Sequence, residues 1–190
     1  MKILISSRVE KSAYNETWYV FEYSLIKFLN ETWPKAQIVC ALIGEKNIPN
    51  DYDLLVIPGG STPGENIQRD NYEKQLILDA RQKGKKILGI CRGAQLLASI
   101  DGAILEMAEG HIGVERSLDR NIKLSGICFH NWAIFDLKES WQILSRDIVD
   151  GSIEIFCSKD KNELAIMSHP ERLESVVDVA ENLGVFFDFT

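Results

Sequence analysis

The sequence has no long hydrophobic run, and this absence excludes one class of protein. No segment of the 190 residues approaches the roughly 18 consecutive apolar residues that a membrane-spanning helix requires. The first residues, MKILISSRVEKS, contain too few apolar positions before the polar ones for a secretory signal peptide. We therefore expect a cytoplasmic protein without a membrane partner.

Cysteine, histidine and positive charge are scarce as well. The cysteines form no C-x-x-C pair and lack metal-like spacing to a histidine; they are Cys40, Cys91, Cys128 and Cys157. We therefore expect reduced thiols and neither a metal nor another cofactor. With 21 Lys and Arg against 28 Asp and Glu, the net charge of −7 argues against a nucleic-acid partner. A small anionic ligand held by a local arginine is still compatible with that charge.

Strand-like and helix-like apolar segments alternate along the first half of the chain, and this order indicates the fold class. Their patterns predict strands at 2–7, 37–43, 53–60 and 85–91 and helices at 17–33, 71–84 and 92–100. This alternation predicts a parallel sheet with helices on both faces. After Gly102, short strand-like segments predict antiparallel hairpins, and a helix over 172–189 closes the chain. We predict one domain over residues 1–190, an α/β three-layer sandwich with a flavodoxin-like, mostly parallel sheet and an antiparallel hairpin extension.

The segment KKILGICRGAQLLASI places a cysteine between two glycines where a strand becomes a helix. Gly89-Ile90-Cys91-Arg92-Gly93 has the G-x-nucleophile-x-G form of a nucleophile elbow. The sharp turn needs small neighbours, because larger side chains would collide with adjacent strands. It lifts the thiol above the carboxyl edge of the sheet, at a helix N-terminus that favours the thiolate. The pattern therefore favours Cys91 as an exposed nucleophile over a buried structural cysteine.

A nucleophilic thiolate needs a base, and the sequence has three histidines. His169 follows an apolar strand in AIMSHPERLES, and Pro170 keeps the chain extended. Glu171 lies two residues after His169, so it points the same way in an extended chain and can orient the imidazole. We predict a triad of Cys91, His169 and Glu171. A surface histidine followed by a helix-capping glutamate is the alternative.

The other two histidines give weaker signals. His130 lies between apolar residues in ICFHNWAI, where an isolated histidine is more often a satisfied structural group than a ligand. His111 lies in the predicted loop EGHIG. Contact of either histidine with a substrate stays open.

An acyl-transfer site also needs an oxyanion hole. In an elbow, the residue after the nucleophile donates one main-chain N–H, and here that residue is Arg92. The loop IPGGSTPGE follows a neighbouring strand, and Gly59 or Gly60 would let its main chain approach a ligand closely. A plain tight turn is the alternative for this loop.

The segments VIPGG, GICRGAQLLA and SHPE, in this order, resemble the class I (triad) glutamine amidotransferase superfamily over nearly the whole chain. The resemblance implies Cys91 as nucleophile, His169 as base and Glu171 as the orienting group. It also implies an oxyanion hole made by the main-chain amides of Gly60 and Arg92. Candidate contacts to a bound γ-glutamyl group are Gly59, Gln95, His130, Asn131 and Trp132.

Two branches of this superfamily differ in their partners. Amidotransferase domains supply ammonia to a synthase, whereas γ-glutamyl hydrolases use water and act alone; no synthase segment follows the triad here, so we expect none to be fused. The segments SSRVEKSAYNETWYVFEYSL and CFHNWAI resemble the γ-glutamyl-γ-aminobutyrate hydrolase type, with Cys128 where serine is usual. GHIG and IEIFCSKDKNELAIMSHPER resemble hydrolases of γ-glutamyl-CDP-amidate in capsule biosynthesis, although the segment at Val114-Glu115-Arg116 departs from that group.

The resemblance thus implies a hydrolase that cleaves a γ-glutamyl amide bond of a small molecule through a thioester. Arg8, in the loop after the first strand, is the candidate for facing an anionic leaving group, and a solvated arginine is the alternative. Two other functions stay open. One is the ammonia-donating glutaminase subunit of a two-chain amidotransferase, which would need a synthase partner, and the other is a non-catalytic binding module. A homodimer is also left open.

Overall fold

The central layer of the computed structural model is a seven-stranded sheet with the order β11-β12-β13-β6-β5-β1-β4. The structure describes residues 1–46, 48–120, 122–160, 162–187 and 189. Strands β13, β6, β5, β1 and β4 run parallel, and β12 and β11 continue the sheet antiparallel. The strands are β1 (Lys2–Ser6), β4 (Gln37–Ala41), β5 (Leu54–Ile57), β6 (Lys86–Ile90), β11 (Trp141–Arg146), β12 (Ile153–Ser158) and β13 (Glu163–Ile166).

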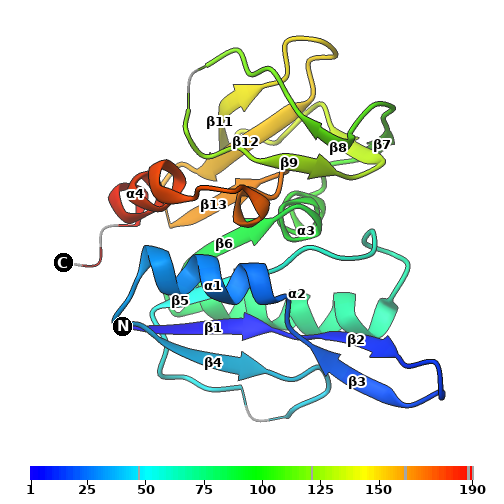
Figure 1. Cartoon of the computed structure of the whole chain (residues 1–190), viewed down its shortest axis with the longest axis vertical. Coiled ribbons are helices and arrows are strands. Elements are labelled where there is room, and N and C mark those ends of the chain that lie inside the picture. The colour runs from blue at the N-terminus through cyan, green and yellow to red at the C-terminus, as the bar shows by residue number, and fades with distance from the viewer. Residues whose placement is uncertain (47, 121, 161, 188, 190) are drawn as a thin grey trace.

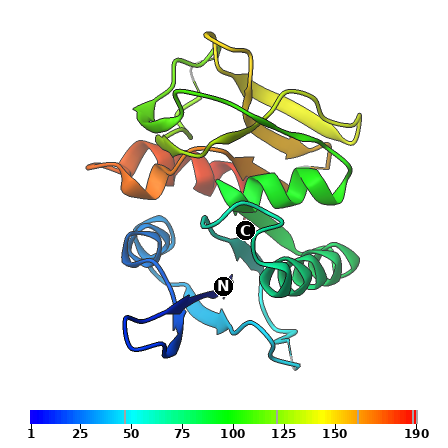
Figure 2. The ribbon, with the colours of Figure 1, turned by 90° about the vertical axis from the view of Figure 1, so that its right-hand side faces the viewer.

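Helices cover both faces of this sheet (Figures 1 and 2). On one face lie α1 (Tyr23–Thr32) and α4 (Val177–Phe186), and on the other lie α2 (Ile67–Gln82) and α3 (Arg92–Ile100). A hydrophobic core lies on each face of the sheet, and β1 contributes to both. Ile3 and Ile5 pack with α1 on one face, and Leu4 packs with α2 on the other. This double burial explains the continuous apolar strands. No helix in the described ranges is long and apolar enough to cross a membrane.

Three short antiparallel pairs lie outside the seven-stranded sheet. They are β2 (Arg8–Lys11) with β3 (Thr17–Val20), β7 (Leu105–Met107) with β10 (Trp132–Ile134), and β8 (Ile112–Glu115) with β9 (Ile127–Phe129). The two pairs after Gly102 confirm the antiparallel strands predicted there, whereas the β2–β3 pair was not predicted. The β8–β9 pair lies in the upper part of Figure 1, near β12. The three-layer α/β prediction, with a mostly parallel sheet and antiparallel additions, is confirmed.

Three predicted helices were wrong at their starts. The helix expected over 71–84 begins one turn earlier, at Ile67, because the Asn66 side chain accepts from the Arg69 main-chain N–H and caps it there. Residues 17–20 form β3 instead of the first turns of a helix, because Thr17, Trp18, Tyr19 and Val20 are β-formers that pair with β2. The helix begins only at Tyr23. Near the other end of the chain, the 3₁₀ turn η1 (Pro170–Arg172) is separated from α4 by extended backbone at Leu173, so that helix starts at Val177.

Candidate active site

Cys91 stands at the turn between β6 and α3 in a strained conformation. Its φ of 50° and ψ of −106° are unusual for a residue other than glycine. The main-chain N–H of Cys91 donates to the carbonyl of Ile166 on β13 at 2.7 Å, which ties the turn to the neighbouring strand. The residue is the N-cap of α3, so its thiol lies at the positive end of that helix. These features are those of a nucleophile elbow.

The two glycines that flank the elbow are required by close main-chain packing. A Cβ atom on Gly93 would lie 2.0 Å from the carbonyl oxygen of Ile57 on β5. A Cβ atom on Gly89 would lie 2.7 Å from Leu97 Cδ1 and 2.8 Å from the main chain of Gly93. Any larger residue would therefore push α3 away from the sheet, as the sequence pattern predicted.

The structure brings the three predicted triad residues together. His169 follows β13, and its Nδ1 lies 2.6 Å from Oε1 of Glu171 on η1. On its other side His169 lies close enough to the Cys91 thiol for that group to raise the pKa of the imidazole. The main-chain N–H of His169 donates to the carbonyl of Ile127 on β9 at 2.8 Å, so this strand holds the backbone of the histidine.

The surroundings of His169 favour its charged form. Burial lowers its pKa, but the hydrogen bonds with Cys91 and Glu171 outweigh burial and raise the pKa of His169 to about 9. A protonated imidazole beside a thiol is the arrangement that stabilises a thiolate nucleophile. Cys91, His169 and Glu171 can thus form an ion-paired relay suited to acyl transfer.

The triad is enclosed, which differs from the predicted exposed thiol. Cys91 lies at the carboxyl edge of the parallel strands as predicted, but its exposed fraction is only 3%. The loop after β5 lies directly against the base, since a Cβ atom on Gly59 would be 2.6 Å from Cε1 of His169. The ring of Phe129 meets His169 edge-on with 6.0 Å between ring centroids. The thiol and the base are therefore both enclosed.

The predicted oxyanion loop rests on a buried arginine that sequence reasoning missed. Arg69, on α2, donates to the carbonyls of Pro58 and Gly59 at 3.2 and 3.1 Å. Gly60 has a φ of 146°, and a Cβ atom there would lie 2.3 Å from Nη1 of Arg69. The guanidinium thus holds the carbonyls of Pro58 and Gly59 and lies against Gly60.

Charged partners hold Arg69 and the predicted oxyanion residue Arg92. Arg69 pairs with Glu73 at 2.9 Å, and the buried Arg92 side chain pairs with both Asp70 and Glu73. Ser6 at the end of β1 donates to Glu73 at 2.6 Å. The signal for this network was the segment RDNYE, whose first and last residues lie four apart on one helix face.

The predicted substrate contacts fall into two groups. The side-chain amide of the buried Gln95 donates to the carbonyl of Trp132 at 2.9 Å, so these two residues lie together. Trp132 also lines a hollow of about 190 Å³ with Leu105 and residues 62–65. Asn131 is exposed next to it. Arg8 lies instead beside Gly60, with Cδ 3.3 Å from the position of a Cβ there, and pairs with Glu10 at 3.4 Å.

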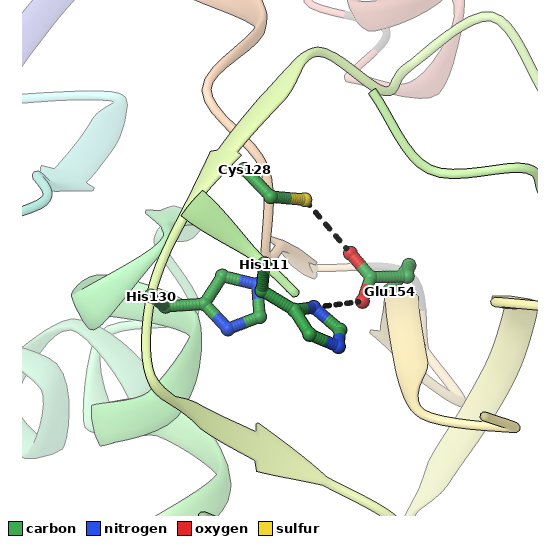
Figure 3. Close-up of side chains that lie close together, drawn as sticks. All are labelled: His111, Cys128, His130 and Glu154. Atoms are coloured by element: carbon green, nitrogen blue, oxygen red, sulfur yellow. Dashed lines mark hydrogen bonds and ion pairs between the residues drawn. The ribbon is translucent and has the colours of Figure 1, made fainter. Parts of the chain in front are cut away.

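His130 and His111 share a buried cluster that the sequence did not predict. Their ring centroids are 4.7 Å apart, and Cys128 and Glu154 complete the group (Figure 3). Burial, helped by His111, lowers the pKa of His130 to about 4. Contact of His130 with a substrate stays a prediction.

Comparisons with known proteins agree with this architecture. Residues 31–126, which contain the elbow and the loop at Gly59, match the profile of the DJ-1/PfpI family. The chain belongs to the DJ-1/PfpI family. Its fold is the class I glutamine amidotransferase-like fold, as in the crystal structure of a glutamine amidotransferase from Thermotoga maritima (TM-score 0.63, 16% identity, 90% of this chain and 76% of that one).

Two curated relatives share parts of the sequence. The gamma-glutamyl-CDP-amidate hydrolase of Campylobacter jejuni is 38% identical over 105 residues, which are 55% of this chain and 52% of that protein. The matched part thus spans about half the length of that relative. Phosphoribosylformylglycinamidine synthase subunit PurQ of Wolinella succinogenes is 26% identical over 164 residues, covering 67% of this chain and 75% of that protein.

Proposed function

We propose that this chain hydrolyses a γ-glutamyl amide bond, with Cys91 as nucleophile, His169 as acid and base, and Glu171 as the group that orients His169. The observation that carries the proposal is the continuous relay from the strained elbow thiol through His169 to Glu171. In such a relay the histidine takes the proton of the nucleophile and later gives it to the leaving group, within one buried site.

The proposed reaction gives each of these groups one role. The Cys91 thiolate attacks the γ-carbonyl carbon, and the main-chain amides of Gly60 and Arg92 stabilise the oxyanion. Protonated His169 gives its proton to the leaving nitrogen as the C–N bond breaks, which leaves a γ-glutamyl thioester. His169 then takes a proton from water, hydroxide attacks the thioester, and the C–S bond breaks to release glutamate and the thiolate. This chemistry uses no metal and no cofactor.

The glutamyl group is expected at the hollow beside Trp132. Gln95 already contacts the main chain there, and Gly59 lets the main chain of its loop lie directly against His169. Gly59, Gln95, His130, Asn131 and Trp132 are the proposed contacts to this half of the substrate. Because Cys91 is only 3% exposed, we expect substrate binding to require a local opening of the structure above the thiol.

The substrate that we propose is a γ-glutamyl nucleotide amidate such as γ-glutamyl-CDP-amidate, with a γ-glutamyl amine as the second choice. The name of the Campylobacter relative supports the first compound, although the match covers about half of that protein. Purified protein incubated with γ-glutamyl-CDP-amidate, γ-glutamyl-γ-aminobutyrate and glutamine separates these possibilities by the rate of glutamate release. Hydrolysis of the amidate at the highest kcat/KM supports the proposal, and turnover of none of the three contradicts it.

The alternative function is a glutaminase subunit that donates ammonia to a synthase. The similarity to a phosphoribosylformylglycinamidine synthase subunit supports it. Under this alternative, glutamine would be the best of the three substrates, and a synthase partner would stimulate its hydrolysis. Preference for the amidate by the chain alone would exclude this alternative.

Arg8 is the proposed contact to an anionic leaving group. Its side chain is partly buried beside the proposed oxyanion loop, and its guanidinium can grip a phosphate through two parallel hydrogen bonds. We expect Arg8→Ala to lower kcat/KM for the nucleotide amidate by about tenfold, about 1.4 kcal/mol, without a change for γ-glutamyl-γ-aminobutyrate. Lys11→Ala, in the exposed part of the same hairpin, is the matched control. Equal losses on both substrates would show that Arg8 does not face the leaving group.

A further inference from the structure

Four metal-binding side chains converge on one buried point outside the triad. His111 precedes β8, Cys128 lies in β9, His130 follows β9, and Glu154 lies in β12. One donor atom from each lies within 4.8 Å of the others. The exposed fractions are 0% for His111 and Cys128, 1% for Glu154 and 5% for His130. Figure 3 shows the Cys128 sulfur and a ring nitrogen of His111 directed at the carboxylate of Glu154, with the ring of His130 beside them.

The polar atoms inside this cluster are poorly satisfied. Nδ1 of His111 and both ring nitrogens of His130 have no hydrogen-bond partner of ordinary geometry among the described residues, although the main chain of Trp132 is near His130. Glu154 lies 3.6 Å from the Cys128 sulfur and 3.7 Å from Nδ1 of His111. The second of these separations is too long for a hydrogen bond, and buried polar atoms without partners are costly. Lone pairs that point into a shared buried space are what a metal ion would satisfy.

Groups around the cluster already hold His111 in the tautomer that a metal needs. Nε2 of His111 lies 2.7 Å from Oδ2 of Asp150, so the ring donates its N–H outward and presents the Nδ1 lone pair inward. Asp150 is itself fixed by the Ser152 main-chain N–H at 2.9 Å and by Arg116 at 3.2 Å. A carboxylate behind a ligating histidine is the usual outer partner of a metal site.

We propose that His111, Cys128, His130 and Glu154 bind one divalent ion of the zinc class. Two imidazole nitrogens, one thiolate and one carboxylate are ligands that Zn²⁺ accepts, and together with Zn²⁺ they form a neutral group. In a zinc tetrahedron the ligand atoms lie about 3.4 to 3.8 Å apart, so the four side chains would close by about 1 Å on binding. Binding would release the Cys128 proton to solvent.

The ion would serve structure rather than the reaction. Four protein ligands complete a tetrahedron and leave no position for a substrate or a water, so the proposed contact of His130 with the substrate would be made by its main chain. The ligands join the β8–β9 pair to β12 of the central sheet. Ile127, next to Cys128, holds the main chain of His169, so the ion would brace the strand that supports the catalytic base.

Cobalt substitution tests the site directly. Chelator-treated protein titrated with Co²⁺ is expected to bind about one ion, with thiolate charge-transfer absorption and the strong visible bands of tetrahedral cobalt. The absorption is expected to persist in Cys91→Ser and in the matched control Cys157→Ser, and to disappear in Cys128→Ser. Absence of the bands in the wild type, or their persistence in Cys128→Ser, would overturn the proposal.

A second variant, which removes no ligand, tests the site even if Cys128→Ser does not fold. Asp150→Asn keeps all four ligands and the shape of the outer partner, and we expect it to weaken cobalt affinity by about tenfold or more. In parallel, Zn²⁺ is expected to raise the Tm of the wild type more than that of Asp150→Asn. Equal cobalt affinity in both proteins, or no rise of the wild-type Tm with Zn²⁺, would count against the site.

Discussion

Cys91 and Cys128 are both buried, and each has a histidine and a glutamate beside it, yet their surroundings have opposite effects. Around Cys91, hydrogen bonds outweigh burial and raise the pKa of His169 to about 9. Around Cys128, burial lowers the pKa of His130 to about 4, and burial followed by the Glu154 charge raises the pKa of the Cys128 thiol. The first group thus favours separated charges, and the second favours neutral side chains.

The two cysteines differ in their surroundings because the main chain places them differently, although the residue types around them are similar. Cys91 is held at the N-terminus of α3 by a strained turn, and Glu171 is aimed at the far nitrogen of His169. Cys128 lies within a strand, and its sulfur is 3.6 Å from the carboxylate of Glu154, whose charge opposes a thiolate. The same residue types can therefore form a nucleophile in one place and a set of metal ligands in the other.

The largest expected contrast is in turnover. Cys91→Ser and His169→Ala should each lower kcat on the γ-glutamyl amidate by about 10⁴-fold or more, because the members of such a relay act as a unit. Cys128→Ser should keep kcat within the same order of magnitude as the wild type. Glutamate release under saturating substrate measures this, and near-normal turnover by Cys91→Ser would require another nucleophile.

Substitution of Glu171 and of Glu154 should change kcat by different factors, and this difference should be smaller than that between Cys91 and Cys128. Glu171→Gln keeps the size of the side chain but loses the charge that orients His169, and we expect kcat to fall by about 10²-fold, less than for Cys91→Ser. Glu154→Gln should leave kcat nearly unchanged while it weakens cobalt binding. Steady-state kinetics of both variants test this, and a larger loss in Glu154→Gln than in Glu171→Gln would reverse the assignment of the two sites.

Stability against pH should report the charged state of His169. Its pKa in the folded protein, about 9, exceeds the ordinary value of 6.5, so its stabilising contribution is complete below pH 6.5 and is lost as pH rises through 9. The expected loss of unfolding free energy across this range is on the order of 3 kcal/mol. Urea unfolding at pH 6 and pH 9.5 measures it. His169→Gln should remove this loss and Cys128→Ser should retain it; an identical loss in His169→Gln would show that other groups cause it.

Alkylation should give the smallest contrast, because both thiols are enclosed. Limited iodoacetamide at neutral pH is expected to label Cys91 at least about tenfold faster than Cys128. A protonated His169 beside Cys91 favours the thiolate, whereas burial and the charge of Glu154 raise the pKa of the Cys128 thiol. Mass spectrometry of the peptides, followed together with activity, gives both rates. Activity that survives complete labelling of Cys91 would contradict its role.

The elbow was predictable because its constraints are local. The turn at Cys91 needs glycine at positions 89 and 93, and both positions lie within two residues of the cysteine. This short spacing is visible in the sequence and predicts a strand, a turn and a helix. The helix expected over 17–33 was wrong at its start for the opposite reason, because the conformation there depends on pairing with another strand. Spacing of Trp18 and Phe21 suited a helix, but pairing of residues 17–20 with β2 decided their conformation.

The sequence by itself determined the parallel sheet, the elbow at Cys91 and the His169–Glu171 pair, because each depends on residues that are neighbours in the chain or follow a regular period. The tertiary structure alone decided that Arg69 supports the loop at Gly59 and that His111, Cys128, His130 and Glu154 meet. Prediction of no metal rested on spacing along the chain, whereas ligand geometry depends on distance in space. Strands β9 and β12 are far apart in sequence, and only their packing brings those four donors to one point.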